Sequence, residues 1–169
     1  SWQHKKFTNR LGTEQSKNYS SDANYPVVRL ADIYLLYAEA LQETNPTVAL
    51  EYVNKVKRRA YGYPVNSTSP VDYLTLTDET MAMKSVRELG KDDHLANDPL
   101  KDERWAELFA EGQLWFDVRR WEIGEEEMKF YKENRAGTLT WRGEDCYVQP
   151  IPKTEIERYN GNLQQSGQY

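Results

Sequence analysis

Three glutamates, Glu103, Glu107 and Glu111, have the spacing in this sequence that most suggests chemistry, because they recur at every fourth position. On a helix, residues four apart share one face, so this spacing predicts a row of carboxylates. Like charges stacked in this way are mildly unfavourable alone, and the row should therefore meet cations. We considered a metal site, a glycosidase carboxylate pair and a structural ion-pair network.

The first two interpretations lack their remaining parts. A metal site needs further ligands, yet the Glu-x-x-His pattern of helical di-iron bundles is absent, and the histidines His4 and His94 fall in regions predicted to be irregular. A glycosidase pair normally places its two acids on separate elements across a cleft. The favoured interpretation is a network of ion pairs with Arg104, and with Arg58 or Arg59 on a neighbouring helix.

Other reactive sets are missing from the sequence. It contains no G-x-S-x-G nucleophile motif and no glycine-rich phosphate loop. Asp117 beside Arg119 and Arg120 predicts a salt bridge at a helix end. Cys146 is the single cysteine, so it can form neither an internal disulfide nor a cysteine-based zinc site, and we interpret it as a small apolar residue in a strand. The sequence predicts no enzyme, no catalytic residue, no metal and no cofactor.

Composition narrows the class of protein further. A length of 169 residues suits one domain, and 38% hydrophobic with 29% charged residues suits a globular fold. The net charge of −5 argues against a general nucleic-acid binder, which needs clustered excess cations. No apolar run is long enough to span a membrane, and there is no signal peptide. Because the chain begins with Ser1 instead of methionine, we expect a piece of a longer protein.

Two helices should position the arginines. Asn45-Pro46 ends the first predicted helix, Gly62 stands where the second should end, and the short link predicts an antiparallel helical hairpin. The pair has the proportions of one tetratricopeptide-like unit, but no second copy appears at that period. Apolar residues at helical spacing define the expected buried stripes: Leu30, Ile33, Tyr34, Tyr37, Ala38 and Leu41 in the first helix, and Ala49, Tyr52, Val53, Val56 and Ala60 in the second.

The carboxylate row belongs to a third predicted helix, which begins at Asp98 with Pro99 in its first turn, runs to about Trp121 and is closed by Gly124. Between the hairpin and this helix, residues 63–97 are predicted to be a variable loop insertion. The other expectations are weaker local patterns. In the first part of the chain they are a strand at Lys6–Thr8 in an irregular N-terminal segment and a helix over Asp78–Leu89. After the third helix they are a charged stretch at Glu125–Glu127, a short helix through Lys132, a β-hairpin of Leu139–Arg142 and Cys146–Gln149 around Gly143-Glu144-Asp145, and an extended tail from Pro150 and Pro152.

Four blocks of the sequence, in order, resemble the C-terminal part of the SusD/RagB family. They are VVRLADIYLLYAEALQE, ALEYVNKVKRRAYG, ERWAELFAEGQLWFDVRRW and PIPKTEI with the closing Gly-x-Tyr. The chain departs from the family pattern at a few positions, which bear on local ion pairing and tail geometry: Leu114 replaces an arginine, Gly161 replaces a proline, and Ser166-Gly167-Gln168 replaces Asn-Pro-Gly.

The resemblance implies a mostly α fold with tetratricopeptide-like helix pairs. Residues 1–169 would form a single C-terminal domain of this family. It further implies an outer-membrane lipoprotein of Bacteroidetes that acts in nutrient uptake and polysaccharide utilisation without catalysis. Its partners would be an oligo- or polysaccharide and a SusC-like TonB-dependent transporter. The lipidated cysteine of such a protein would lie upstream of the matched blocks.

The matched blocks are scaffold, so candidate binding residues come from general chemistry alone. A sugar site needs exposed aromatic planes beside short polar side chains. Tyr61, Tyr63 and Tyr73 flank the 63–97 loop together with Asn66, and Trp141 lies beside a predicted turn. The alternative is that these rings brace the loop against the helical hairpin.

The function predicted first is non-enzymatic binding of a nutrient, above all a glycan, at the bacterial cell surface, with delivery to the transporter. The alternative is a helical interaction scaffold that docks the transporter without contacting glycan. A third possibility, a peptide-binding module of tetratricopeptide type, would require further helix pairs upstream.

Overall fold

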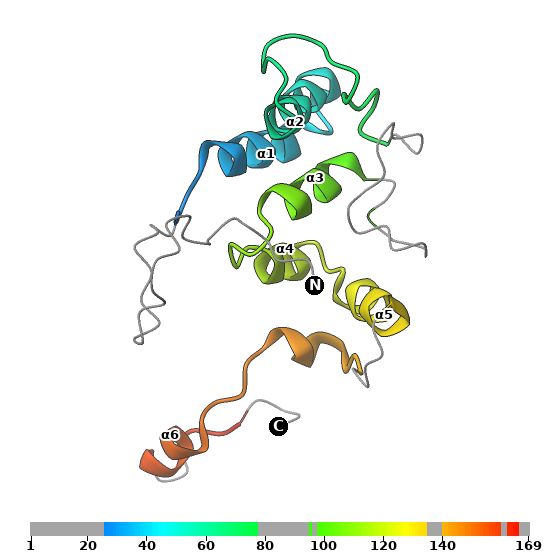
Figure 1. The fold of residues 1–169 in the computed structure, drawn as a ribbon. Coiled ribbons are helices and arrows are strands. Elements are labelled where there is room, and N and C mark those ends of the chain that lie inside the picture. The colour runs from blue at the N-terminus through cyan, green and yellow to red at the C-terminus, as the bar shows by residue number, and fades with distance from the viewer. Residues whose placement is uncertain (1–25, 78–94, 96–97, 135–139, 160–161, 166–169) are drawn as a thin grey trace, which may run out of the picture.

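The computed structural model describes residues 26–77, 95, 98–134, 140–159 and 162–165 (Figure 1). All regular secondary structure in these ranges is helical. No strand occurs within those ranges. The mostly α prediction is therefore confirmed. The elements follow in the order α1 (Leu30–Leu41), α2 (Pro46–Ala60), α3 (Pro99–Glu107), α4 (Leu114–Arg120), α5 (Gly124–Asn134), the 3₁₀ helix η1 (Gly143–Tyr147) and α6 (Lys153–Arg158).

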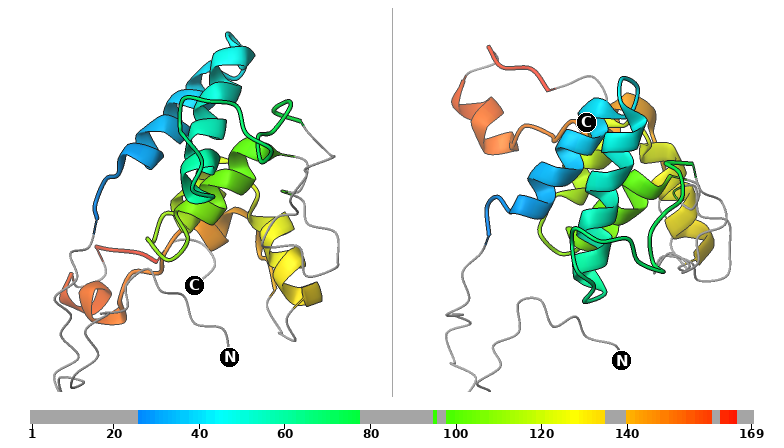
Figure 2. Two further views of the ribbon diagram at one scale, coloured as in Figure 1. Left: turned by 45° about the horizontal axis from the view of Figure 1, so that its top comes forward. Right: turned by 90° about the horizontal axis from the view of Figure 1, so that it is seen from above.

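Helices α1 and α2 lie side by side, joined by a short turn (Figures 1 and 2). The turn ends where Asn45 caps α2 by accepting the Val48 N–H at 3.3 Å, and Pro46 occupies the first helical position. Beyond the far end of α2, Gly62 adopts a φ of 80°, as the sequence predicted for a C-terminal glycine. The two helices thus form where the sequence placed them.

The core between these helices uses only part of the stripe predicted for α1. Ala38 is buried as predicted, and Tyr34 and Leu41 pack against the core cluster. Ala31, Leu35 and Ala38 are the buried residues of α1, whereas Leu30, Ile33 and Tyr37 are exposed. The small side chains let α1 approach α2 closely, which the bulkier residues on the predicted stripe would not allow. The core cluster also contains Ala49, Val53, Val56, Tyr73 and Leu100.

The predicted third helix is two helices. Helix α3 begins at Pro99 as expected, with Asp98 as its cap, but it ends at Glu107. Ala110 and Gly112 have positive φ values of 63° and 77°, and a helix cannot continue through left-handed residues. The break redirects the chain so that Asp117 of α4 accepts a hydrogen bond from the Arg104 side chain of α3 at 2.7 Å.

The predicted β-hairpin is wrong where the structure describes it. Gly143–Tyr147 forms η1, and Cys146 lies in that 3₁₀ helix, where its Sγ accepts the Arg142 N–H at 3.2 Å. The rings of Trp141 and Tyr147 pack against each other, with centroids 5.0 Å apart. The tail is not wholly extended either, since α6 follows Pro152 directly.

Gly124 begins α5 instead of closing the preceding helix, and the predicted short helix is confirmed from there to Asn134. The predicted strand at Lys6–Thr8 and helix over Asp78–Leu89 lie outside the described residues, as does Leu139. Among the described helices, none combines the length and the apolar character needed to cross a bilayer.

Replacing Gly124 by alanine is expected to destabilise the protein by about 1–3 kcal/mol, because the added methyl group would overlap a packed core. A Cβ at this position would overlap the Trp141 ring and lie 2.7 Å from the Tyr147 hydroxyl, which accepts the Gly124 N–H at 2.9 Å. Urea unfolding measures the loss. Gly62→Ala, which meets no atom within 4 Å but needs a positive φ, is the control for backbone strain alone. An equal loss in both variants would contradict the packing argument.

Candidate functional site

The carboxylate row lies on the side of α3 and its C-terminal turn that faces the α1–α2 pair. Glu103 and Glu107 are in α3, Glu111 follows it, and all three are buried. A buried carboxylate is stable only with hydrogen-bond donors or with a bound proton. The partners of each glutamate therefore decide whether the row is a reactive site or a brace.

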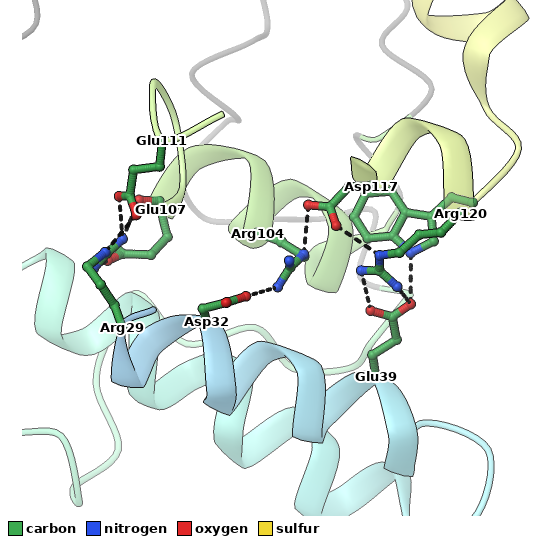
Figure 3. Close-up of polar contacts among 9 residues, drawn as sticks. Arg29, Asp32, Glu39, Arg104, Glu107, Glu111, Asp117 and Arg120 are labelled. Carbon is green, nitrogen blue, oxygen red and sulfur yellow. Dashed lines mark hydrogen bonds and ion pairs between the residues drawn. The ribbon is translucent and has the colours of Figure 1, made fainter. Parts of the chain in front are cut away.

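Arg29, just before α1, holds two members of the row (Figure 3). Its Nη1 donates to Glu107 at 2.7 Å, while Nε and Nη2 donate to the two oxygens of Glu111 at 2.9 and 2.7 Å. Nη2 also donates to the Glu107 backbone carbonyl at 2.9 Å. Arg59 of α2 reaches Glu107 at 2.5 Å, which confirms the predicted Arg59 pair. Arg29 was not predicted as a partner of the row, although its place directly before an amphipathic helix was a usable signal.

Arg104 does not pair with the row, so that part of the prediction is wrong. The buried guanidinium instead donates to Asp32 of α1 at 2.6 Å and to Asp117 of α4 at 2.7 Å (Figure 3). The physical reason is the break after α3, which places the Asp117 carboxylate beside Arg104. This one side chain therefore joins three helices.

The predicted salt bridge at the end of α4 is confirmed between Asp117 and Arg120, at 2.9 Å. Arg120 also pairs with both oxygens of Glu39 on α1, and the Trp121 indole N–H donates to Glu39 at 2.8 Å. Burial alone would raise the pKa of Glu39, but the hydrogen bonds from Arg120 and Trp121 outweigh it and lower that pKa.

Of the two arginines of α2 that were predicted as partners of the row, Arg58 pairs with other carboxylates. It binds Asp72 through Nε and Nη2 at 2.8 and 2.6 Å, and Glu51 at 2.9 and 3.0 Å. It also donates to the Val65 carbonyl at 3.0 Å. Burial raises the pKa of Asp72, but hydrogen bonds from Arg58 and Ser69 lower it overall. Arg58 thus fastens the start of the 63–97 loop to α2.

Glu103 is the member of the row that sits among few cations. Its carboxylate lies 3.3 Å from the Tyr73 hydroxyl, which is also 3.4 Å from Asp102. The Lys57 ammonium lies 3.2 Å from the centroid of the Tyr73 ring. Burial, opposed by the charge of Lys57 and reinforced by Asp102 and Glu107, raises the pKa of Glu103 to about 8. This carboxyl can hold a proton at neutral pH, but it lies inside the helix packing.

The row therefore supports the interpretation as a brace. Glu107 and Glu111 are bound by arginine forks, and Glu103 is buried against Tyr73. Within the described ranges, no group of three or more His, Cys, Asp or Glu side chains could hold a metal ion. The geometry ties α3 and α4 to α1 and α2, and the row offers no open carboxylate pair to a substrate.

The predicted binding residues near the loop divide into two groups. The exposed fractions of Tyr61 and Tyr63 are 44% and 40%, and Asn66 is exposed on the same segment. Tyr73 is 3% exposed and is held by hydrogen bonds between its backbone and the Asn54 side chain, at 2.8 and 3.0 Å. Tyr73 thus has no open ring face and braces the loop, as the alternative interpretation stated.

Trp141 is separate from these residues. It packs on Gly124 and on Tyr147, in the segment beside η1, whereas Tyr61 and Tyr63 follow α2. In Figure 1 the segment of η1 and the segment after α2 lie on opposite sides of α3 and α4. The described structure therefore does not bring Trp141 into one site with the tyrosines.

The family model and the curated relatives that match this chain all belong to the SusD family or are SusD-like proteins. The model of the SusD family matches residues 1–169. The chain is 32% identical to SusD-like protein P25 of Formosa agariphila over 67% of this chain and 18% of that relative. It is 26% identical to SusD-like protein P2 of the same organism, over 94% of this chain and 28% of the relative. The chain spans less than a third of the length of these relatives. No solved structure gives a significant match.

Proposed function

Because this chain belongs to the SusD family, as its four sequence blocks indicated, we propose that it serves non-enzymatic binding of a nutrient glycan at the bacterial cell surface. The family match over residues 1–169 is the observation that carries this proposal. The long protein of which this chain would be the C-terminal domain delivers the glycan to a SusC-like TonB-dependent transporter. It is held at the outer membrane by a lipid anchor upstream of these residues.

The arrangement of the carboxylates supports the non-enzymatic part of the proposal. Glycoside hydrolysis needs two carboxyl groups facing an open space where the sugar lies. In the row on α3, Glu107 and Glu111 accept hydrogen bonds from Arg29, and Glu103 is buried beneath Tyr73. These groups stabilise the scaffold that would present a binding loop.

The exposed tyrosines after α2 support the glycan-binding part. Sugars stack their C–H faces on aromatic rings and bond their hydroxyls to short polar side chains. Tyr61 and Tyr63 stand exposed near Asn66 on a segment that Arg58 and Asn54 anchor to α2. A fixed platform of this kind loses little conformational entropy when a ligand binds. We propose Tyr61, Tyr63 and Asn66 as contacts of the glycan.

Replacing Tyr61 and Tyr63 together by alanine is expected to weaken glycan binding about 5–150-fold, since each stacked ring contributes about 0.5–1.5 kcal/mol beyond burial. The measurement is retardation of the natural full-length product in native gels that contain candidate polysaccharides. Tyr159→Ala, which removes an exposed tyrosine directly after α6, is the matched control and should bind as the unmodified protein does.

Two results would count against this assignment. Unchanged retardation of the double variant would remove the tyrosines from the site. Binding of the transporter with no retardation on any polysaccharide would favour the alternative, a scaffold that docks the transporter without contacting glycan. Glycosidic cleavage by the purified protein, lost on replacing a carboxylate, would contradict the non-enzymatic proposal.

A further inference from the structure

A pocket lies where the beginning of α1 meets the last turns of α2. Its volume is about 240 Å³. Pockets for drug-sized ligands measure about 300–1,000 Å³, so this one suits a group of the size of a single sugar ring. The lining residues come from three segments: Arg29, Leu30, Ala31 and Tyr34 at the start of α1, Lys55, Val56 and Arg59 in α2, and Val65 in the segment that follows α2.

The pocket adjoins the segment that carries the proposed glycan contacts. Val65, one of its walls, lies between Tyr63 and Asn66 in the sequence. The Val65 carbonyl accepts a hydrogen bond from the Arg58 side chain at 3.0 Å, and the Tyr63 N–H donates to the Arg58 carbonyl at 2.8 Å. These bonds hold the segment against the end of α2. The pocket and the proposed contacts therefore share one short, anchored piece of chain.

The charged side chains among the described lining residues are all cationic: Arg29, Lys55 and Arg59. Both arginines donate to Glu107, and Arg29 also pairs with Glu111 (Figure 3). The two glutamates are buried on α3 and in the turn that follows it. Three positive charges thus meet two negative charges in this group, which leaves an excess of one positive charge at the pocket.

Lys55 supplies the excess charge. It is half-buried, its ammonium lies 4.8 Å from the centroid of the Tyr52 ring, and it forms no ion pair within the described ranges. Arg59 is 55% exposed, and its Nη2 donates to Glu107. The remaining N–H groups of the Arg59 guanidinium make no hydrogen bond to another described residue. A guanidinium fork binds carboxylates and phosphate-like oxyanions through paired hydrogen bonds, so these two side chains can take an anion from outside.

We propose that this pocket binds an acidic sugar residue, which carries a carboxylate or a sulfate group, and that the protein therefore selects anionic glycans. The sugar ring would lie against the apolar walls formed by Tyr34, Val56 and Val65, and its acid group would pair with Lys55 and Arg59. A neutral sugar would use the walls but not the cations, and a free inorganic anion would use the cations but not the walls. This inference rests on the proposed function, since it names the class of glycan that the same region takes.

Titration calorimetry of the natural full-length product with paired polysaccharides tests this selection. Polygalacturonate, alginate, chondroitin sulfate and dextran sulfate are each compared with their carboxyl-reduced or desulfated form at the same ionic strength. We expect at least one acidic polymer to bind at least about tenfold more tightly than its neutral form, with a difference that shrinks as salt is added.

Three variants assign the selection to the pocket. Lys55→Gln should weaken binding of the acidic polymer about 5–20-fold, between the effects of an exposed ion pair and of a charged hydrogen bond. It should leave binding of the neutral form unchanged. Lys55→Arg keeps the charge and should keep most of the affinity. Lys129→Gln, which removes an exposed lysine of α5, changes the net charge equally and should bind as the unmodified protein does.

Each other outcome overturns the inference. Equal affinity for the acidic and neutral forms, or binding of neutral polysaccharides alone, would show that the glycan is not selected by charge, while the proposed function would stand. Equal losses in Lys55→Gln and Lys129→Gln would assign the preference to the overall charge of the protein instead of the pocket. Binding of no polysaccharide at all would contradict the proposed function and the inference together.

Discussion

Replacing Arg104 by alanine is expected to lower the free energy of unfolding by about 3–5 kcal/mol, the usual cost of removing one partner from a buried ion pair. The guanidinium is buried and bonds to Asp32 and Asp117 at 2.6 and 2.7 Å. Its removal leaves both carboxylates without their shared donor and breaks one link between α4 and α1, while Arg120 still pairs with Glu39. Urea unfolding at neutral pH measures this loss.

Two matched variants make the Arg104 result specific. Arg104→Lys keeps the charge but not the planar fork that reaches two carboxylates on different helices, so we expect an intermediate loss. Arg119→Ala removes an exposed arginine of α4 and should change stability by less than about 0.5 kcal/mol. Equal losses for Arg104→Ala and Arg119→Ala would show that the three-helix junction contributes nothing.

Local signals in the sequence predicted the helices well. Asn45-Pro46, Asp98-Pro99 and Gly62 each mark an end that the structure has, because capping and proline restrictions act within a few residues. The break in the third helix was missed, since Ala110 adopts a left-handed conformation that its residue type does not announce. The β-hairpin failed for a related reason: Trp141 and Tyr147 pack on Gly124, a contact between distant segments that alternation cannot reveal.

The sequence predicted that the carboxylate row has cationic partners, but it could not identify all of them. The four-residue spacing correctly implied cations, but the identity of each cation depends on which helix crosses α3 at that level. Arg29 is 82 positions from Glu111 in the sequence, and Arg104 is 72 positions from Asp32. Such pairings are set by tertiary packing, so the sequence could not separate Arg58, which holds the loop, from Arg59, which reaches the row.

The choice of the buried face of α1 illustrates the same limit. The first helix has apolar residues around most of its circumference, and periodicity alone cannot say which face meets α2. Close packing decides, because Ala31 and Ala38 allow the helix axes to approach while Leu30 and Tyr37 do not. Leu30, Ile33 and Tyr37, which periodicity assigned to the core, are therefore exposed.

Replacing Glu103 by glutamine is expected to stabilise the protein at pH 8–9 by about 1–3 kcal/mol and to change it little at pH 5. Burial raises the pKa of Glu103 from 4.5 to about 8, so the folded state binds this proton more tightly than the unfolded chain does. The stability that the bound proton provides is complete below about pH 4.5, falls as pH rises, and is lost above about pH 8. Glutamine cannot ionise, so it removes this dependence.

Glu107→Gln is the matched control, one helical turn along the same face. Its carboxylate accepts from Arg29 and Arg59 at 2.7 and 2.5 Å, so we expect a loss of about 1–3 kcal/mol at pH 5 and at pH 9 alike. Urea unfolding of both variants at several pH values measures the two effects, which should have opposite signs at pH 9. A destabilised Glu103→Gln at that pH would mean that Glu103 is ionised and paired with Lys57, and that all three glutamates of the row are anchored by cations.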